Sequence, residues 1–285
     1  YNIGKRIPVR GAGKTLLVAG VAAGFAGLFR TPLAAVCFAL ELFGIGMLEI
    51  DALIPVMAAA FSANLTSGLL GMEKFHADIA SIGAFDIPLV SRLIVLGIAC
   101  GMTGYLFSQT IRRLKGYFGE KLKNSLVRIA IVGAVAAVLL LLCGYGRYAG
   151  ASEELIEAAV GGKGTVYAWD FLAKLFFTAL CIAGGFVGGE VAPMFAIGAT
   201  LGAVLGGAMG MPPAFAAMLG YAAVFGAGTN TFFASVVVGA EIFGWHFFPY
   251  FFLVSSVAYA CNRNRSIYPQ HTFRELLERV DRDKE

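Results

Sequence analysis

Charged side chains are scarce in this chain. Asp, Glu, Lys and Arg make up 14% of the 285 residues, whereas hydrophobic residues make up 58% and the mean hydropathy is +0.77. An ordinary soluble domain carries about a quarter charged residues. The composition therefore excludes a typical soluble protein and predicts an integral membrane protein that has the lipid bilayer as a partner.

Residues that bind metals or form disulfides are few and dispersed. The three histidines lie far apart, and the five cysteines form no CxxC pair or Cys/His cluster. A metal site needs ligands that converge, so we predict no metal site and no cofactor, and we interpret the cysteines as small core residues. Lys and Arg total 22 against 18 Asp and Glu, and they line no groove with interleaved aromatics, which argues against a nucleic-acid partner.

Apolar segments follow one another along the whole chain. We expect them at about residues 15–29, 32–48, 52–72, 87–108, 125–149, 166–187, 191–209, 213–228, 231–243 and 245–261. Several are shorter than the roughly 20 residues that a simple spanning helix needs. Short segments interrupted by Gly or Pro must be buried in protein or line a polar cavity, because lipid cannot satisfy their backbone groups. This pattern is typical of a transporter or channel.

Charged residues outside these segments predict the orientation of the chain. Residues 112–128 contain six Lys or Arg and one Glu, which indicates a cytoplasmic loop, whereas the acidic stretch 72–86 is expected outside. Apolar residues recur at helical spacing in the polar tail, which predicts a cytoplasmic amphipathic helix over 263–285. The remaining residues, 1–262, are expected to form a multi-pass domain in the plasma (inner) membrane, truncated on its N-terminal side because YNIGKR has neither Met nor a signal-peptide pattern.

Two segments far apart in the sequence share a pattern. Residues 24–44 and 225–244 each have a Gly/Ala-rich approach, a short polar elbow, an apolar run and then Glu, a hydrophobic residue, Phe and Gly. In transporters such repeats often meet at the substrate site. The alternative is that membrane helices rich in small residues resemble one another by composition.

The run GGEVAPMFAIGATLG, residues 188–202, places a carboxylate among small apolar residues. Pro193 fits the first turn of a helix that starts near Glu190, and the free N–H groups of that turn attract an anion. Gly188 and Gly189 would let the backbone approach a small ion closely. A carboxylate within a membrane is costly and is a candidate for function, although Glu190 could instead cap its own helix. The glycines at the end of the run could instead form a small-residue packing face.

Tyr268 is a second candidate. It lies in RSIYPQHTFRELLER, which opens the predicted tail helix, and its hydroxyl can donate to an anion. A tyrosine at this kind of position more commonly serves as an interfacial anchor.

Taken together, these motifs resemble one family. GGEVAPMFAIGATLG is similar to the GGxFxPxxxxGxxxG motif of CLC chloride channels and proton-coupled antiporters, FRTPLAAVCFALE to their FNAPLAGxxFxxEE segment, and RSIYPQHTFRELLER to their KPLYxAILxR tail. The resemblance implies an all-α membrane protein, an inverted repeat of tilted and re-entrant helices with the N-terminal helices missing, that assembles as a homodimer. It also implies that Gly188, Gly189, the amides of Glu190 and Val191, and the Tyr268 hydroxyl bind a halide.

Two departures from the family pattern point to one branch. Glu190 stands where the family usually has an apolar residue, and Leu42 follows Glu41 where chloride/proton antiporters have a second glutamate. Both departures resemble the fluoride/proton antiporters, which implies proton transfer by Glu190. Fluoride is strongly hydrated, so a site that removes its water must supply strong donors. The leading hypothesis is fluoride export coupled to proton import, and the alternative is a chloride channel or chloride/proton exchanger.

Two other classes of protein fit the sequence poorly. A membrane-embedded hydrolase would need a serine or aspartyl motif, and no GxSG occurs, so we do not expect an enzyme. A membrane scaffold would have no use for broken helices and a buried acid, which are costly features.

Overall fold

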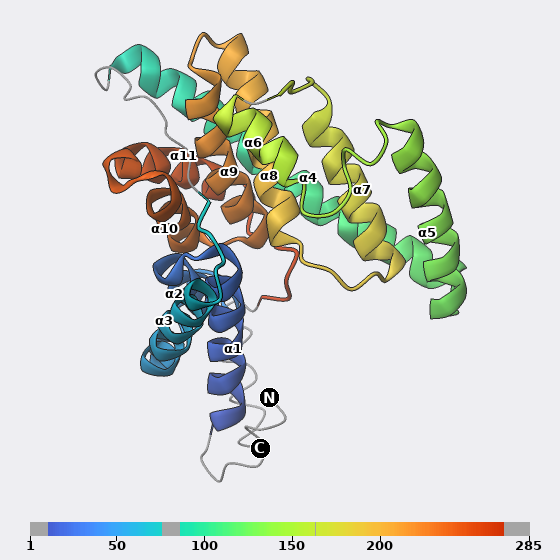
Figure 1. Cartoon of the computed structure of the whole chain (residues 1–285), viewed down its shortest axis with the longest axis horizontal. Helices are drawn as coiled ribbons and strands as arrows, with labels where there is room; N and C mark the ends of the chain where they lie inside the picture. The colour runs from blue at the N-terminus through green and yellow to red at the C-terminus, as the bar shows by residue number, and fades with distance from the viewer. Residues whose placement is uncertain (1–10, 76–85, 163, 271–285) are drawn as a thin grey trace. The chain divides into compact units, whose positions relative to one another are not determined.

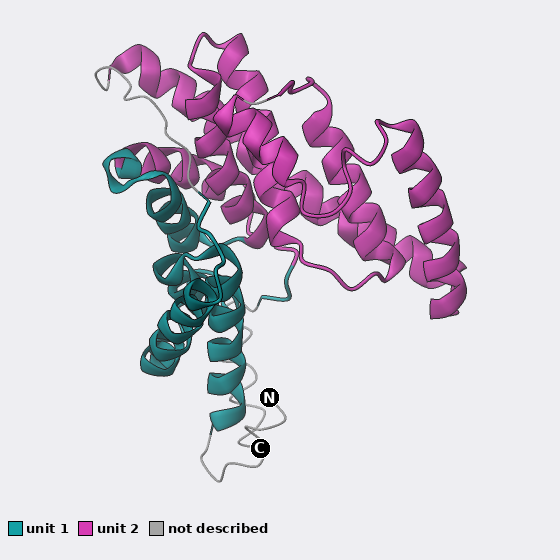
Figure 2. Ribbon diagram, viewed as in Figure 1, with its two compact units in different colours: residues 1–76, 230–248, 268–285 teal, residues 77–229, 249–267 magenta. Residues whose placement is uncertain are grey.

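The computed structural model describes residues 11–75, 86–162 and 164–270, and within these ranges every regular element is a helix (Figure 1). The prediction of an all-α fold is therefore confirmed. The chain divides into two compact units, each built from stretches that are discontinuous in sequence (Figure 2). The predicted boundary at residue 262 stays a prediction, because most of the predicted tail helix, residues 271–285, is not among the described residues.

Unit 1 comprises residues 1–76, 230–248 and 268–285. Its helices are α1 (Ala12–Phe29), α2 (Pro32–Glu41), η2 (Ile50–Ala52), α3 (Leu53–Leu69), α10 (Phe232–Phe243) and η3 (Trp245–Phe247). Helix α2 is the centre of the unit, since it packs against α1, α3 and α10 and all but two of its residues are buried. A helix this short that is apolar on all sides can be stable only inside protein.

Unit 2 comprises residues 77–229 and 249–267. Its helices are α4 (Ile87–Lys121), α5 (Ser125–Leu142), α6 (Glu153–Gly161), α7 (Asp170–Gly184), α8 (Val191–Ala208), α9 (Pro213–Thr229) and α11 (Phe248–Cys261). The most extensive helix pairing is between α8 and α9, where the rings of Phe195 and Tyr221 stack with centroids 4.0 Å apart. Most of the glycine run, from Val191 onward, therefore lies in a helix that packs closely against α9.

Five helical segments in the described part of the chain are long and apolar enough to cross a bilayer: 12–29, 50–69, 87–121, 125–142 and 191–208. Helices α2, α9 and α10 are apolar but shorter. This mixture of long and short apolar helices agrees with the predicted multi-pass membrane domain.

The structure corrects three sequence predictions. Residues 112–121 are not part of a loop but continue α4 to Lys121, so only 122–124 separate it from α5. Helix α5 ends at Leu142, and residues 143–149, which were included in the predicted apolar segment 125–149, form turns. Helix α6 was not predicted at all, because three glutamates interrupt its short apolar pattern; it buries Leu155 and Ile156 and exposes those glutamates. Most of the acidic stretch 72–86, and the tail from residue 271, are not among the described residues, so their predicted sides of the membrane stay predictions.

Candidate functional site

The segment that leads into the glycine run starts at Gly185, directly after α7 ends. Gly185 takes a left-handed conformation with φ of 101°, and its N–H donates to the carbonyl of Ile182 while that of Phe186 donates to Cys181. A residue with a side chain would be strained at this φ, so glycine is what allows the helix to stop here. Residues 186–189 then follow without regular structure, and α8 starts at Val191, as the sequence predicted.

Glu190 is the residue that precedes α8. Its backbone conformation is helical, with φ of −87° and ψ of −19°, and its carbonyl accepts the N–H of Met194 at 3.3 Å. Its side chain makes no capping hydrogen bond, so the interpretation of Glu190 as the cap of its own helix is wrong. The side chain of Glu190, which is half-buried, therefore makes no hydrogen bond to the first turn of α8.

The backbone amides of this segment are available to a ligand. Within the described part of the chain, the N–H groups of Gly188, Gly189, Glu190 and Val191 donate no hydrogen bond to protein. A Cβ added to Gly188 or Gly189 would meet no atom within 4 Å, so packing does not require glycine at these two positions. Free donors just before and at the start of α8, where the helix end carries partial positive charge, make this stretch suited to an anion.

The other glycines of the run serve packing. A Cβ on Gly198 would collide with the backbone carbonyl of Gly220, and one on Gly202 with that of Ala216, so both allow α8 to approach α9 closely. The small-residue packing face is therefore present, but it is confined to the part of the run that lies inside α8.

A cation binds the end of α7, four residues before the glycine run. Arg128, in the first turn of α5, donates from Nε to the carbonyl of Gly184 at 3.2 Å. A positive side chain at a helix C-terminus donates to a free carbonyl and is attracted by the partial negative charge of that helix end. Sequence reasoning missed this contact because Arg128 lies 56 positions before Gly184.

Tyr268 belongs to unit 1, whereas Glu190 and Val191 belong to unit 2. The Tyr268 ring packs edge-on against Phe38 of α2, with centroids 6.2 Å apart and planes at 65°. Two residues later, the Gln270 side-chain oxygen accepts a hydrogen bond from Asn230 Nδ2 at 3.0 Å. Within unit 2, the preceding Ile267 N–H and Ser266 hydroxyl donate to the carbonyls of Gly228 and Thr229. The chain is thus fixed on both sides of the tyrosine.

The two similar sequence segments adopt the same local structure. Arg30 and Asn230 both have a left-handed φ of 57°, and each is followed by a threonine and a short apolar helix, α2 or α10. The glutamates near the ends of these helices, Glu41 and Glu241, occupy equivalent positions 200 residues apart. The compositional explanation does not account for this agreement, which supports a structural repeat.

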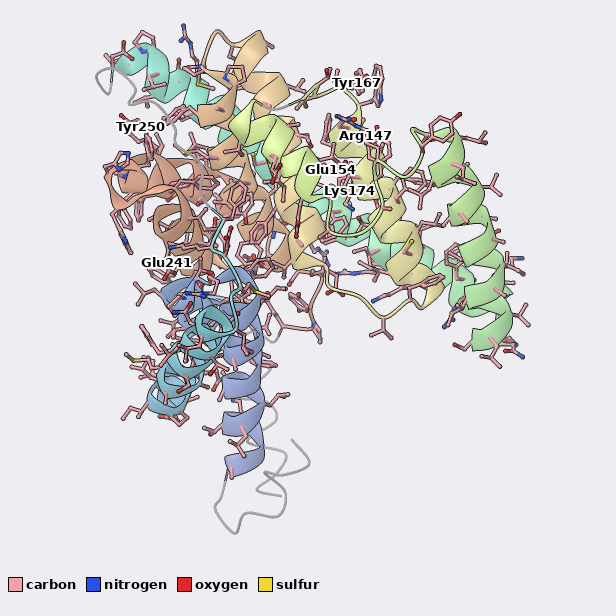
Figure 3. All side chains as sticks on the ribbon, viewed as in Figure 1. Arg147, Glu154, Tyr167, Lys174, Glu241 and Tyr250 are labelled. Atoms are coloured by element: carbon pink, nitrogen blue, oxygen red, sulfur yellow. The ribbon has the colours of Figure 1, made fainter. Side chains whose placement is uncertain are left out.

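Each glutamate binds the start of the other helix (Figure 3 labels Glu241). Glu41 accepts from the N–H groups of Phe232, Phe233 and Ala234 at 2.8–3.0 Å. Glu241 accepts from those of Leu33 and Ala34 at 3.3 and 2.9 Å. The two helices are therefore antiparallel, and each has a carboxylate at its positive end.

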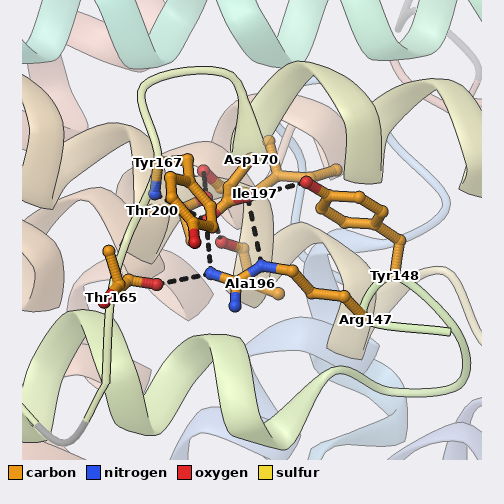
Figure 4. A network of polar contacts seen from close by, with 8 residues as sticks. All are labelled: Arg147, Tyr148, Thr165, Tyr167, Asp170, Ala196, Ile197 and Thr200. Atoms are coloured by element: carbon orange, nitrogen blue, oxygen red, sulfur yellow. Dashed lines mark hydrogen bonds and ion pairs between the residues drawn. The ribbon is translucent and has the colours of Figure 1, made fainter. Parts of the chain in front are cut away.

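A polar network in unit 2 was also missed from the sequence (Figure 4). Asp170, which is fully buried at the start of α7, accepts from Arg147 at 2.7 Å, from the Tyr148 hydroxyl at 2.8 Å and from the Tyr167 N–H at 2.9 Å. Burial, followed by this hydrogen bond, raises the pKa of Tyr148 to about 12, so its hydroxyl remains a donor at neutral pH. One turn along, Lys174 donates to the carbonyls of Tyr148 and Gly150. The network fastens residues 147–150 to α7.

Comparison with known sequences agrees with the motifs. The voltage gated chloride channel family matches residues 5–263. A chloride/fluoride channel protein of Pseudomonas syringae pv. tomato is 32% identical over 259 residues, covering 90% of this chain and 57% of that protein. An H(+)/Cl(-) exchange transporter ClcA of Cronobacter sakazakii is 28% identical over 215 residues, covering 70% and 45%. The chain thus spans about half the length of these curated relatives.

Comparison with solved structures identifies the fold. A CLC-type fluoride/proton antiporter superposes with a TM-score of 0.90 and 42% identity, covering 95% of this chain and 69% of that chain. A slow cyanobacterial Cl-/H+ antiporter gives a TM-score of 0.74 at 18% identity, which supports the fold alone. The predicted CLC-like architecture is therefore confirmed.

Proposed function

Because this chain belongs to the voltage-gated chloride channel family, we propose that it forms part of an anion transporter that exports fluoride in exchange for protons. The observation that carries the proposal is the carboxylate of Glu190 beside the four free amides of residues 188–191. The amides supply donors for the anion, and the carboxylate supplies a group that can take up and release a proton. The 42% identity to a fluoride/proton antiporter supports the same substrate.

We propose that backbone donors at the start of α8 bind the anion, and that the Tyr268 hydroxyl is an anion ligand, as its resemblance to the family's tail motif implies. A small, strongly hydrated ion such as fluoride gains most from several short N–H and O–H donors, because these replace the water that it loses. A protonated Glu190 would add one more donor, whereas an ionised Glu190 would repel the anion. The protonation state of Glu190 would therefore control how strongly the anion is held.

Chloride transport is the second candidate function. One curated relative is described as a chloride/fluoride channel and another as a proton/chloride exchanger. Flux measurements distinguish a fluoride/proton antiporter, a chloride channel and a chloride/proton exchanger. The full-length protein would be reconstituted in liposomes loaded with fluoride or chloride, and electrodes would record anion efflux and proton uptake. Our proposal requires fluoride efflux, accompanying proton uptake and much slower chloride efflux. Equal efflux of both anions without proton movement would identify a chloride channel instead.

We further propose a homodimer in the inner membrane with a cytoplasmic C-terminus. Helix α3 exposes a stripe of apolar side chains at helical spacing: Ile54, Met57, Phe61, Leu65 and Leu69. This stripe lies within residues 32–70, which resemble the family's subunit-contact helices. Disulfide cross-linking of an Ile54→Cys variant in membranes tests the contact, and a protein that remains monomeric under oxidation and in detergent would contradict it.

A further inference from the structure

The segment that carries Tyr268 rests on the place where α2 and α10 meet. Phe38, in the last turn of α2, contacts the tyrosine ring, and Asn230, two positions before the start of α10, donates a hydrogen bond to Gln270. One contact therefore comes from α2 and the other from the turn that leads into α10. The position of the Tyr268 ring depends on how the end of α2 and the start of α10 lie relative to one another.

Glu41 is the residue that joins these two helix ends. Its carboxylate is 8% exposed and accepts three hydrogen bonds, all from the first amides of α10. Hydrogen bonds to an ionised group are about twice as strong as neutral ones, and the positive end of the α10 dipole adds to them. Glu41 also lies three positions after Phe38, on the same face of α2.

We infer that Glu41 is a positioning residue for the anion site. By holding the start of α10 on the end of α2, it fixes Phe38 and Asn230 relative to each other and so sets the location of the Tyr268 hydroxyl. The inference rests on the proposed function, in which that hydroxyl is a ligand of the anion. In this role Glu41 neither contacts the ion nor carries its proton.

The structural repeat supplies a matched control. Glu241 is the equivalent carboxylate and binds the amides of Leu33 and Ala34, at the beginning of α2. Its hydrogen bonds lie one to two helical turns from Phe38 and do not involve Asn230. Replacing either glutamate with glutamine removes one negative charge from a helix N-terminus. Only the hydrogen bonds of Glu41 lie next to Phe38 and Asn230, the residues that contact the tyrosine segment.

The experiment measures fluoride binding to the purified full-length protein by titration calorimetry. Glu41→Gln, Glu241→Gln, Tyr268→Phe and the double variant Glu41→Gln/Tyr268→Phe would be compared. We expect similar losses of thermal stability from both glutamine variants, but a loss of fluoride affinity of about tenfold only from Glu41→Gln, as when one hydrogen bond to an ion is weakened. In the Tyr268→Phe background, Glu41→Gln should cause no further loss, because both changes act on one interaction.

Several outcomes would overturn the inference. Equal fluoride affinity of Glu41→Gln and Glu241→Gln would leave Glu41 a purely structural role, and additive losses in the double variant would show that it does not act through Tyr268. If Tyr268→Phe alone leaves binding unchanged, the proposed ligand role fails, and the inference fails with it. If Glu41→Gln does not fold, Phe38→Leu removes the ring contact while keeping the Glu41 bonds; unchanged affinity in that variant would also refute the inference.

Discussion

Gly198 of α8 and Gly220 of α9 contact each other through their backbones. A Cβ on either residue would collide with the carbonyl oxygen of the other. The α8–α9 pair therefore depends on two residues without side chains, and it positions the helix whose N-terminus carries the amides proposed to bind the anion. Close approach of this kind is how helices pack in membranes, where there is no hydrophobic force between them.

Gly220→Ala is expected to destabilise the protein. The added methyl group meets backbone atoms, which cannot move aside as a flexible side chain could, and overpacking of this kind costs about 1–3 kcal/mol. Thermal unfolding in detergent, followed by circular dichroism, measures the change. The matched control is Gly116→Ala on α4, where nothing lies within 4 Å of the added Cβ; alanine should stabilise this exposed position slightly. Equal unfolding temperatures for the two variants would contradict the packing argument.

Asp170→Asn is expected to cost about 3 kcal/mol of unfolding free energy. The variant replaces the carboxylate that accepts hydrogen bonds from Arg147, the Tyr148 hydroxyl and the Tyr167 N–H. It also leaves the partly buried guanidinium of Arg147 without its counter-ion. Chemical unfolding in mild detergent measures the loss. Glu154→Gln, at an exposed position on α6, removes a carboxylate with no such partners and should change stability by less than about 0.5 kcal/mol. Comparable stability of the two variants would show that the network contributes little.

Sequence reasoning succeeded where the signal was local. The apolar runs predicted most helices, and the succession of glycine, Glu190 and Pro193 predicted the start of α8. The end of α4 and the existence of α6 were missed. Charged residues at the end of α4 suggested a loop, although a helix can extend beyond the bilayer and expose them to water.

The interactions that hold the site together could not be derived in the same way. Glu41 and its partner Phe232 are 191 positions apart, and Arg128 is 56 positions from Gly184. The sequence repeat did pair Glu41 with Glu241 as equivalent residues. It could not show that each binds the other's helix, because that requires the antiparallel arrangement of α2 and α10.

Tyr268→Phe is expected to weaken fluoride binding by about tenfold, because it removes one hydrogen-bond donor and keeps the ring that packs on Phe38. Calorimetry of the full-length variant measures the affinity, and liposome flux shows whether each transported anion still moves with a proton. We expect the coupling to persist, because the hydroxyl is a ligand and not the proton carrier. Tyr250→Phe provides the control, since Tyr250 packs edge-on against Phe215 instead. An equal change in both variants would indicate a general effect of losing a tyrosine hydroxyl.

Glu190→Gln is expected to abolish proton movement while leaving the protein folded. Glutamine keeps the size of the side chain and its capacity to donate, but it cannot exchange a proton in the accessible pH range. The backbone amides of residues 188–191 are unchanged by the substitution, so fluoride should still bind and should move, if at all, only down its own gradient. Parallel recordings of fluoride efflux and proton uptake in liposomes measure the ratio, with Glu157→Gln on α6 as the control for losing an exposed acid. Because Glu190 does not cap α8, a change in thermal stability would be unexpected, and proton uptake that continues at the original ratio would assign the proton to another residue.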